Sequence, residues 1–329
     1  MNKKISLLII VILLFLTSCK FNNNDKLKNE VLLPVRLNEE WGFINLQGDL
    51  IIPFKFEKAN VFSENLAAVK FNNKWGYIDR QGKIVIPTIF DYVGNFKDGI
   101  SAVQKDYKYS IIKNDGSLVV PYSSNFNLIL FSEGMIPFKE KGKYGYLNYD
   151  GKVIIEPKFD DCMFFSEEIS AVKVGESWSF INKKGEFIFK KEFEDVLIFK
   201  EGLAAVKIDD KWGYIDPQGK IIIEPQFKYA YIFSEGLTSV NINGKWGFIN
   251  LKGDLVIQPI YDYKTIFSEG LARVSYKGKW GYINKEGEIT IECKYYYARD
   301  FLNGIAKVTT EDRKLGYINK KGKFIWLEK

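Results

Sequence analysis

The amino-acid sequence predicts an all-β protein made of about nine tandem units of 34 or 35 residues. The first observation is a recurring string, K-W-G-Y-I-D-x-x-G-K, whose tryptophan position falls at Trp41, Trp75, Tyr109, Tyr144, Trp178, Trp212, Trp246, Trp280 and Leu315. The second is a turn glycine at the same interval, at Gly48, Gly82, Gly116, Gly151, Gly185, Gly219, Gly253, Gly287 and Gly322. The third is that β-branched and aromatic residues dominate every unit, without helical periodicity. Neighbouring units of this length must cover one another's apolar surfaces.

The N-terminal segment has the features of an export signal. Two lysines precede an apolar run at residues 5–16, which is too short to favour a membrane-spanning helix. The end of this run, L-T-S-C, resembles the lipobox of bacterial lipoproteins, and the resemblance implies cleavage before Cys19 and lipid on its sulfur. We therefore expect a signal peptide at residues 1–18, and a lipidated cysteine with a flexible tether at residues 19–31. An ordinary secretion signal or an uncleaved anchor is the alternative.

Within each unit the pattern predicts a meander of three antiparallel strands. In one unit these strands are expected at residues 203–208, 211–215 and 220–224. The first two are joined by a two-residue turn, which in the next unit is Asn-Gly, a strong hairpin signal. The turn that begins at Asp216 has the residues of a type I turn followed by a glycine bulge. Pro225 is expected to end the third strand, and about a dozen residues carrying F-S-E-G then lead to the next unit.

The predicted strands are apolar on both faces, so each sheet needs cover on both sides. Nine such units could stack into an open, curved β-solenoid or close into a propeller-like ring. Propeller blades usually have four strands and about 40 residues or more, whereas three strands are predicted here in a shorter unit. We therefore expect residues 32–329 to form the open solenoid, with the closed ring as the alternative.

The tryptophan position and the glycine that follows it are expected to be structural. They are Trp41, Trp75, Trp178, Trp212, Trp246, Trp280, Gly42, Gly76, Gly213, Gly247 and Gly281. The tryptophan position also accepts tyrosine and Leu315, which indicates packing rather than ligand recognition. Ser110 and Ser179 replace the glycine, so we expect a close approach, with a ring lying over the glycine, rather than a left-handed backbone.

Two charged rows are candidates for a binding surface. They are represented by Lys211, Lys245 and Lys279 before the tryptophan position, and by Glu201, Glu235 and Glu269 in F-S-E-G. One interpretation is a charged track for an ionic polymer. The interpretation we favour is solvated strand edges and turns, in which ion pairs contribute little and exposed lysines prevent edge-to-edge aggregation.

Several functional classes are excluded or disfavoured by composition. The absence of histidine excludes Ser-His-Asp and Cys-His nucleophile systems and HExxH zinc sites. No phosphate-binding glycine loop or cluster of metal ligands occurs, so we expect no catalytic residues, no cofactor and no metal. Cys162 and Cys293 stand about four units apart and are expected to be buried thiols without a bridge. The positive charge is too diluted for nucleic-acid binding.

The motif K-W-G-[YF]-I-[ND]-x-x-G-K, followed by I-x-P and F-S-E-G-L-A, resembles the WG-repeat, or KWG-repeat, family of bacteria over nearly all of residues 32–329. The resemblance implies an often exported bacterial protein without a general enzymatic activity. We expect a lipid-anchored, extracytoplasmic interaction scaffold with an unknown protein partner. A glycan- or peptidoglycan-binding surface protein is the alternative, and a polysaccharide hydrolase is a distant third. The least regular units are the third to the fifth.

Overall fold

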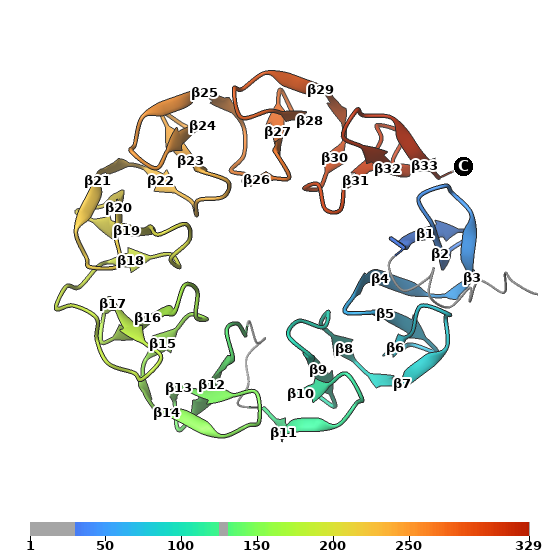
Figure 1. Cartoon of the computed structure of the whole chain (residues 1–329), viewed down its shortest axis with the longest axis horizontal. Helices are drawn as coiled ribbons and strands as arrows, with labels where there is room; N and C mark the ends of the chain where they lie inside the picture. Colours follow the sequence, from blue (N-terminus) through green and yellow to red (C-terminus); the bar gives the residue numbers. More distant parts are fainter. Residues whose placement is uncertain (1–29, 125–130, 329) are drawn as a thin grey trace, which may run out of the picture.

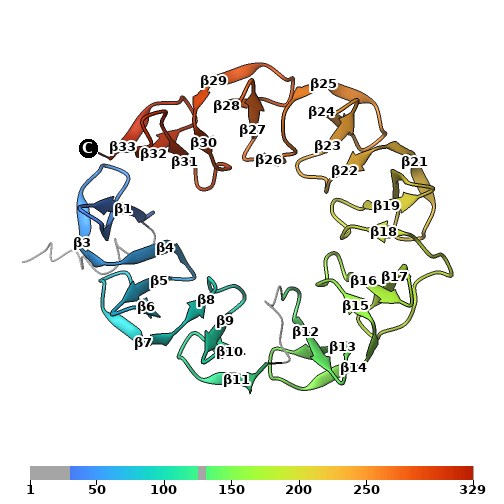
Figure 2. The same ribbon diagram turned by 180° about the vertical axis from the view of Figure 1, so that it is seen from behind.

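The computed structural model describes residues 30–124 and 131–328, which form a closed ring of nine β-sheets (Figure 1). Residues 1–29, which contain the expected signal peptide, Cys19 and most of the tether, lie outside the described residues. The chain runs once around the ring, so that its first and last sheets are neighbours, and the view from behind shows the same closure (Figure 2). This is the arrangement of a nine-bladed β-propeller, and we number the blades 1 to 9 in chain order.

Six blades contain four antiparallel strands in chain order. Blade 2 contains β4 (Lys58–Ser63), β5 (Leu66–Phe71), β6 (Lys74–Ile78) and β7 (Ile84–Phe90). Blade 3 contains β8 (Tyr92–Val93), β9 (Ile100–Lys105), β10 (Lys108–Lys113) and β11 (Leu118–Ser123). Blade 6 contains β18 (Asp195–Val196), β19 (Ala204–Ile208), β20 (Lys211–Ile215) and β21 (Ile221–Phe227). Blade 7 contains β22 (Tyr229–Ala230), β23 (Leu237–Ile242), β24 (Lys245–Asn250) and β25 (Leu255–Tyr261). Blade 8 contains β26 (Phe267–Ser268), β27 (Leu271–Tyr276), β28 (Lys279–Ile283) and β29 (Ile289–Tyr295). Blade 9 contains β30 (Tyr297–Ala298), β31 (Ile305–Thr309), β32 (Leu315–Asn319) and β33 (Phe324–Leu327).

Three blades show three strands among the described residues. Blade 1 contains β1 (Leu33–Leu37), β2 (Glu40–Ile44) and β3 (Leu50–Phe56). Blade 4 contains β12 (Met135–Glu140), β13 (Lys143–Asn148) and β14 (Val153–Phe159). Blade 5 contains β15 (Asp161–Cys162), β16 (Ile169–Val174) and β17 (Ser177–Asn182). The outer side of blade 5 is held by isolated bridges, such as Trp178 with Phe193, instead of a regular strand.

The open solenoid expected from the sequence is therefore wrong, and the ring named as its alternative is the structure. The error lies in the strand count. The connection carrying F-S-E-G contains a short fourth strand, such as β22, which pairs with the first long strand of the next blade, β23. A regular repeat thus contributes three strands to one blade and the innermost strand to the next. A short inner strand lets a 34-residue repeat complete a propeller blade.

The third strand of each repeat is also longer than expected. Pro225 does not end this strand, because β21 continues to Phe227 and pairs Trp212 with Phe227 and Tyr214 with Ile223. The unequal spacing of these pairs places a bulge around the proline. Since β21 is the last strand of its sheet and lies at the periphery of the ring (Figure 1), the missing amide hydrogen of proline removes no bond to a further strand.

Both predicted turns of the repeat are confirmed. Asn243 and Gly244 have φ values of 51° and 85°, as a two-residue hairpin of type I′ requires. At the second turn, the Asp216 carbonyl accepts a hydrogen bond of 2.9 Å from Gly219, whose φ is 78°. The Asp216 carboxylate also accepts bonds from the amides of residues 218 and 220 at 3.0 and 2.9 Å.

The glycine after the tryptophan position is required by a close approach, as expected, but its neighbour is not a ring. A Cβ at Gly213 would lie 2.5 Å from the Ile223 carbonyl oxygen and 2.7 Å from the Pro225 nitrogen. The obstacle is therefore the bulged backbone of β21. Ser110 is accommodated in blade 3 because its hydroxyl donates a 2.5 Å hydrogen bond to the facing Val120 carbonyl.

The phenylalanine of F-S-E-G joins each blade to the next. Phe233 is fully buried, and its ring packs edge-on against Tyr214 of the preceding blade, with 5.0 Å between the ring centroids. The same inter-blade contact recurs at centroid distances of 4.7 to 5.1 Å in Phe43–Phe62, Tyr77–Phe96, Tyr146–Phe165, Phe180–Phe199, Phe248–Phe267 and Tyr282–Phe301. In blade 3 Ile111 takes the place of the ring and shares a core with Phe131.

The tryptophans lie at the edges of these cores. Trp212 is buried, and the indoles at positions 41, 75, 178, 246 and 280 are half-buried and pack against the blade cores. The ring closes between blades 9 and 1 with its own contacts. The Tyr317 hydroxyl donates a 2.8 Å hydrogen bond to the Pro34 carbonyl, and Arg36 pairs with Glu328 at 3.0 Å.

Replacing Phe233 by alanine tests the inter-blade role of the phenylalanine. The change removes a fully buried ring between blades 6 and 7, so we expect a loss of about 3–5 kcal/mol in unfolding free energy. The measurement is thermal or urea unfolding followed by circular dichroism. Phe71→Ala is the matched control, because Phe71 is 37% exposed at a strand end. Equal destabilisation by the two changes would contradict the inter-blade role.

Candidate interaction surface around the central opening

The F-S-E-G segments form tight hairpins whose tips point to the central opening. In blade 7, Ser234 and Leu237 exchange backbone hydrogen bonds of 2.9 and 3.2 Å. The two tip residues, Glu235 and Gly236, have φ values of 56° and 84°. Both angles fit a type I′ turn, whose twist matches that of the adjoining strands. Eight such tips occur among the described residues, and an acidic residue holds the first tip position in seven of them.

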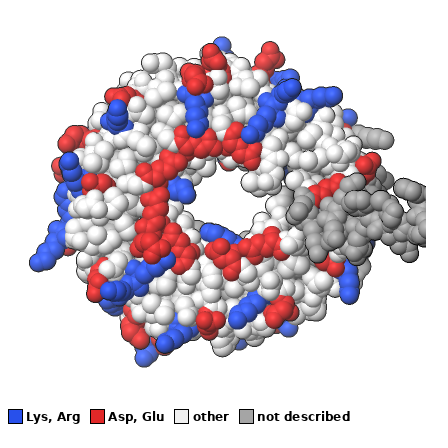
Figure 3. All heavy atoms as spheres, viewed as in Figure 1, with Lys and Arg blue, Asp and Glu red and all other residues white. Residues whose placement is uncertain are grey.

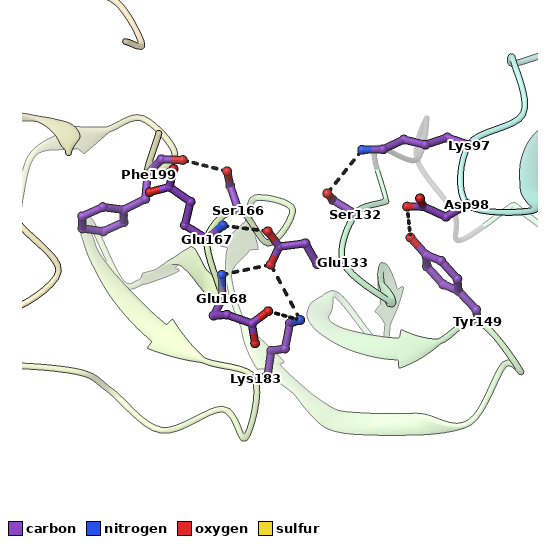
Figure 4. Close-up of polar contacts among 10 residues, drawn as sticks. All are labelled: Lys97, Asp98, Ser132, Glu133, Tyr149, Ser166, Glu167, Glu168, Lys183 and Phe199. Atoms are coloured by element: carbon purple, nitrogen blue, oxygen red, sulfur yellow. Dashed lines mark hydrogen bonds and ion pairs between the residues drawn. The ribbon is translucent and has the colours of Figure 1, made fainter. Parts of the chain in front are cut away.

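Six of the seven acidic tip residues bind the backbone of the next hairpin through their carboxylates. Glu201 accepts hydrogen bonds of 2.6 and 2.8 Å from the amides of Glu235 and Gly236. Glu167 binds the Glu201 hairpin in the same manner, and Figure 4 shows Glu133 bound to the amides of Glu167 and Glu168. The donors are backbone amides that a hairpin tip leaves unpaired. The carboxylates therefore form a chain of charge-assisted bonds from blade to blade.

The serine of the same motif makes a second bond between blades. The Ser234 hydroxyl donates to the Phe267 carbonyl of blade 8 at 2.7 Å. The equivalent bonds run from Ser63 to Phe96, from Ser166 to Phe199 and from Ser268 to Phe301. The turn before the outermost strand of a blade, such as residues 148–151 or 182–185, lies on the same side of the ring as the hairpin tips. Lys183 pairs with Glu133 at 3.7 Å, and Tyr149 donates to Asp98 at 3.1 Å (Figure 4).

The acidic side chains gather into a band around the central opening (Figure 3). We call this band the acidic rim and define it by Glu64, Asp98, Glu133, Glu167, Glu168, Glu201, Glu235 and Glu269. Lys285 and Lys320 pair with Glu235 and Glu269 at 3.2 Å each. By the same spacing, the positions that correspond to these lysines for Glu64, Asp98, Glu167 and Glu201 hold the uncharged residues Asn114, Tyr149, Pro217 and Leu251. The turn lysines therefore compensate only part of the rim, and blades 5 and 6 contain two of the glutamates without such a lysine.

The rim carboxylate of Glu269 is held in its charged form. Burial by itself would raise the pKa of this carboxyl, but the hydrogen bonds from the Gly304 amide and Lys320 outweigh burial and leave the pKa below its ordinary value of 4.5. At neutral pH the carboxylate is therefore charged.

The structure separates the two charged rows that the sequence places in every repeat. The strand β23 begins at the rim hairpin and ends at the Asn243-Gly244 turn, so Lys245 and Glu235 lie at opposite ends of one sheet. Lys245 instead pairs with Asp262 at 2.7 Å, and this hydrogen bond is the main cause that lowers the pKa of Asp262 below 3.8. Lys279 pairs with Glu311.

The third lysine of this row, Lys211, lines a pocket of about 580 Å³ together with Lys228 and Asn241. Lys228 stands in its repeat where Asp262 stands in the next repeat, so two lysines meet here. Near this pocket Tyr229 stacks on Trp246 with 6.4 Å between the ring centroids. Of the proposed surface residues, the structure thus brings Glu201, Glu235 and Glu269 together and places the lysines on the other face.

Sequence reasoning did not find the inter-blade hydrogen bonds of the rim. It also did not find the lysines that pair with the rim, which are Lys183, Lys285 and Lys320. A signal for the lysines exists in the spacing, since Lys285 and Lys320 follow their glutamates by 50 and 51 residues. That interval exceeds one repeat, so a search within single units does not find it. The bonds to backbone amides cannot be predicted from the sequence, because almost any residue type can supply the amide and only the acidic residue is recognisable.

Metal binding and thiol chemistry have little support in the described part of the chain. Residues 30–124 and 131–328 contain no group of three or more histidine, cysteine, aspartate or glutamate side chains placed to hold a metal ion. Cys162 and Cys293 are free and only partly buried, and burial raises the pKa of the Cys162 thiol to about 12. None of the described segments forms a helix that could span a membrane.

Comparison with known proteins supports the repeat and the fold. A model of the WG containing repeat matches residues 41–75, 75–109, 144–178, 178–212, 212–246, 246–280 and 280–313. No curated protein matches the sequence at a significant level. A solved structure of a eukaryotic initiation factor is similar, with a TM-score of 0.67, 13% identity, and coverage of 91% of this chain and 96% of that chain. The computationally designed protein Ika8 has a TM-score of 0.52, 9% identity, and coverage of 88% and 100%. At these identities the likeness shows the fold alone.

Replacing Glu201 by alanine tests the clamp between rim hairpins. The change leaves the amides of Glu235 and Gly236 without their acceptor, so we expect a loss of about 1–2 kcal/mol in unfolding free energy. Urea unfolding measures this loss. Glu286→Ala is the control, because Glu286 is exposed and the structure shows no hydrogen bond to it. Glu201→Ala unfolding at the same urea concentration as the control would show that the rim bonds contribute nothing.

Proposed function

The chain belongs to the family of proteins with the WG containing repeat, and from this premise we propose that it is a non-enzymatic interaction scaffold that binds a basic protein partner on its acidic rim. The observation that carries the proposal is the geometry of the rim. Its carboxylates recur at a regular interval around one opening, and backbone bonds between blades hold them in place. A regular array on a rigid frame suits an extended partner better than a single substrate.

The incomplete charge compensation of the rim supports a basic partner. Lysines pair with Glu235 and Glu269, whereas the positions equivalent to these lysines for Glu167 and Glu201 hold Pro217 and Leu251. An unbalanced set of charges around an opening attracts a partner of opposite sign and speeds its association.

We also propose that the protein is exported and anchored by lipid on Cys19. The support is the L-T-S-C sequence after an apolar run, followed by a polar stretch at residues 20–30. Two or more acyl chains would hold the propeller stably at a membrane. The tether would then leave the ring able to meet partners near the membrane surface.

Glycan binding is a second candidate, favoured by an observation on the opposite face. Tyr229 and Tyr263 stack on Trp246 and Trp280, and the two tyrosines are 51% and 58% exposed. Exposed aromatic rings offer flat apolar surfaces to sugar rings. The pocket beside Lys211 would add donors for an anionic glycan.

The two candidates separate in a capture experiment with the full-length chain and a cell-envelope extract. We expect the double variant Glu167→Gln/Glu201→Gln to capture several-fold less of the partner, because charge is lost while an oxygen acceptor remains. Capture should also fall with added salt. Glu224→Gln/Glu292→Gln changes charge equally on exposed residues of the outer strands β21 and β29, away from the rim. Capture that is abolished by soluble polysaccharide and unchanged in the rim variant would favour glycan binding and reject the rim.

Lipid anchoring is tested by Cys19→Ser. We expect this variant to lose incorporation of radioactive palmitate and to move from the membrane fraction to the soluble fraction. Cys162→Ser is the control, since this cysteine lies within blade 5. Unchanged palmitate incorporation in Cys19→Ser would refute lipidation at this residue.

A further inference from the structure

Blade 1 has no inner strand among the described residues. In blade 9 the inner strand β30 pairs Ala298 with Val308, and Val308 faces Gly316 on its other side. In blade 1 the residue that faces the equivalent glycine, Gly42, is Val35 of β1. No described strand pairs with β1 on the side of the central opening. Within residues 30–124 and 131–328, this backbone edge of β1 is therefore available to an additional strand.

The sequence before β1 lacks the residues that form an inner strand in the other repeats. The alignment of Leu32 with Leu237 places Asp25, Lys28 and Val31 where blade 7 has Ala230, Phe233 and Gly236. The buried phenylalanine is thus replaced by a lysine. The glycine with positive φ is replaced by a β-branched valine, which disfavours that conformation. The spacing of an inner strand is kept, but the residues that would hold it in place are absent.

A pocket of about 820 Å³ lies at this place, and we call it the seam pocket. Its walls come mainly from blades 1, 2 and 9 and include Leu33, Phe62, Phe301, Lys307 and Tyr317. In seven other blades an aromatic ring at the position of Tyr317 packs against an inner-strand phenylalanine. The one described ring that pairs with Tyr317 is that of Trp326, with 6.3 Å between the ring centroids. No described phenylalanine packs on Tyr317 in the way that the repeat provides in those seven blades.

The neighbouring blade shows how a cation in this register binds an inner strand. Arg273 of β27 lies opposite Tyr282, and its guanidinium binds the Asp300 carboxylate at 2.9 Å and the Ala298 carbonyl at 2.8 Å. Both acceptors belong to the inner segment of blade 9. In this blade the cation thus pairs with an acidic residue, Asp300, that directly precedes the phenylalanine Phe301.

Lys307 holds the same register in blade 9, because it lies opposite Tyr317. Its ammonium group lies 5.3 Å from the centre of the Trp41 ring, and no described residue forms a hydrogen bond or ion pair with it. Burial, together with Arg299 and Arg36, lowers the pKa of Lys307 to about 8, although the Glu328 carboxylate acts in the opposite direction. Glu328 is itself paired with Arg36 at 3.0 Å, so the seam pocket presents a cation that no described carboxylate bonds directly.

We propose that the seam pocket binds an extended segment of another protein that carries an Asp-Phe pair, which adds to the edge of β1 as the missing inner strand. The main-chain bonds to β1, the phenylalanine on Tyr317 and the carboxylate on Lys307 would reproduce the contacts of blades 8 and 9. Residues 22–31 of the chain are a poorer occupant, because Lys28 would bring a further positive charge to Lys307 and Arg299. The surface differs from the acidic rim, so the inference stands apart from the proposed function.

The probe is a fluorescein-labelled peptide with the sequence of residues 296–304, Y-Y-A-R-D-F-L-N-G. We expect saturable binding to the full-length chain by fluorescence anisotropy. Binding should weaken about tenfold or more when the peptide carries Phe301→Ala or Asp300→Asn. It should weaken similarly when the chain carries Lys307→Gln, whereas Lys245→Gln is the matched control and should bind normally. The rim variant Glu167→Gln/Glu201→Gln should also bind normally, which keeps this test separate from the proposed function.

A second variant protects the test against misfolding. Replacing residues 24–31 by the sequence of residues 297–304 should fill the seam pocket within the chain, raise the melting temperature by several degrees and abolish peptide binding. Lack of saturable binding at about 1 mM peptide would overturn the proposal. Peptide binding that is unchanged both by Lys307→Gln and by the replacement of residues 24–31 would also overturn the proposal. Equal competition by an unlabelled peptide of residues 22–31 would identify the chain's own segment as the occupant and would also overturn it.

Discussion

The architecture depends on one packing contact, the burial of the F-S-E-G phenylalanine against the ring of the preceding blade. Phe233 and Tyr214 belong to one repeat but to two blades, so the repeat is a link between blades rather than a blade. Removing such a ring exposes the cores on both sides of an inter-blade boundary. This overlap of repeat and blade binds neighbouring sheets without disulfides and turns a chain of repeats into one cooperative ring.

The same hairpins that bury the phenylalanine also build the charged surface. A type I′ turn presents two free amides at its tip, and the glutamate of the preceding hairpin satisfies them. The carboxylates therefore stabilise the ring and concentrate negative charge at its opening. A structural role for these residues and a role in binding are not alternatives, because the bonds that fix the carboxylates also hold them ready for a partner.

The contacts that close the ring between blades 9 and 1 differ from those between the other blades. Among the described residues, seven inter-blade boundaries use an inner strand that the preceding repeat contributes, and β1 of blade 1 has no such partner. The boundary between blades 9 and 1 is held instead by the Tyr317 hydroxyl, the Arg36–Glu328 pair and a small apolar core around Val35. These contacts are made at the outer and middle strands, and the inner position is left as the seam pocket.

The sequence by itself determined the all-β class, the number of repeats, both turns of each repeat and the need for close packing at Gly213. These features depend on neighbouring residues, whose preferences are visible in a single unit. Tertiary structure alone decided that the array closes, that the F-S-E-G connection contains a strand, and that Pro225 lies within one. It also decided that the glutamates and lysines of one repeat face opposite sides of the ring. Each of these outcomes rests on contacts between repeats, and the position of one repeat relative to the next is set by packing geometry that no local pattern records.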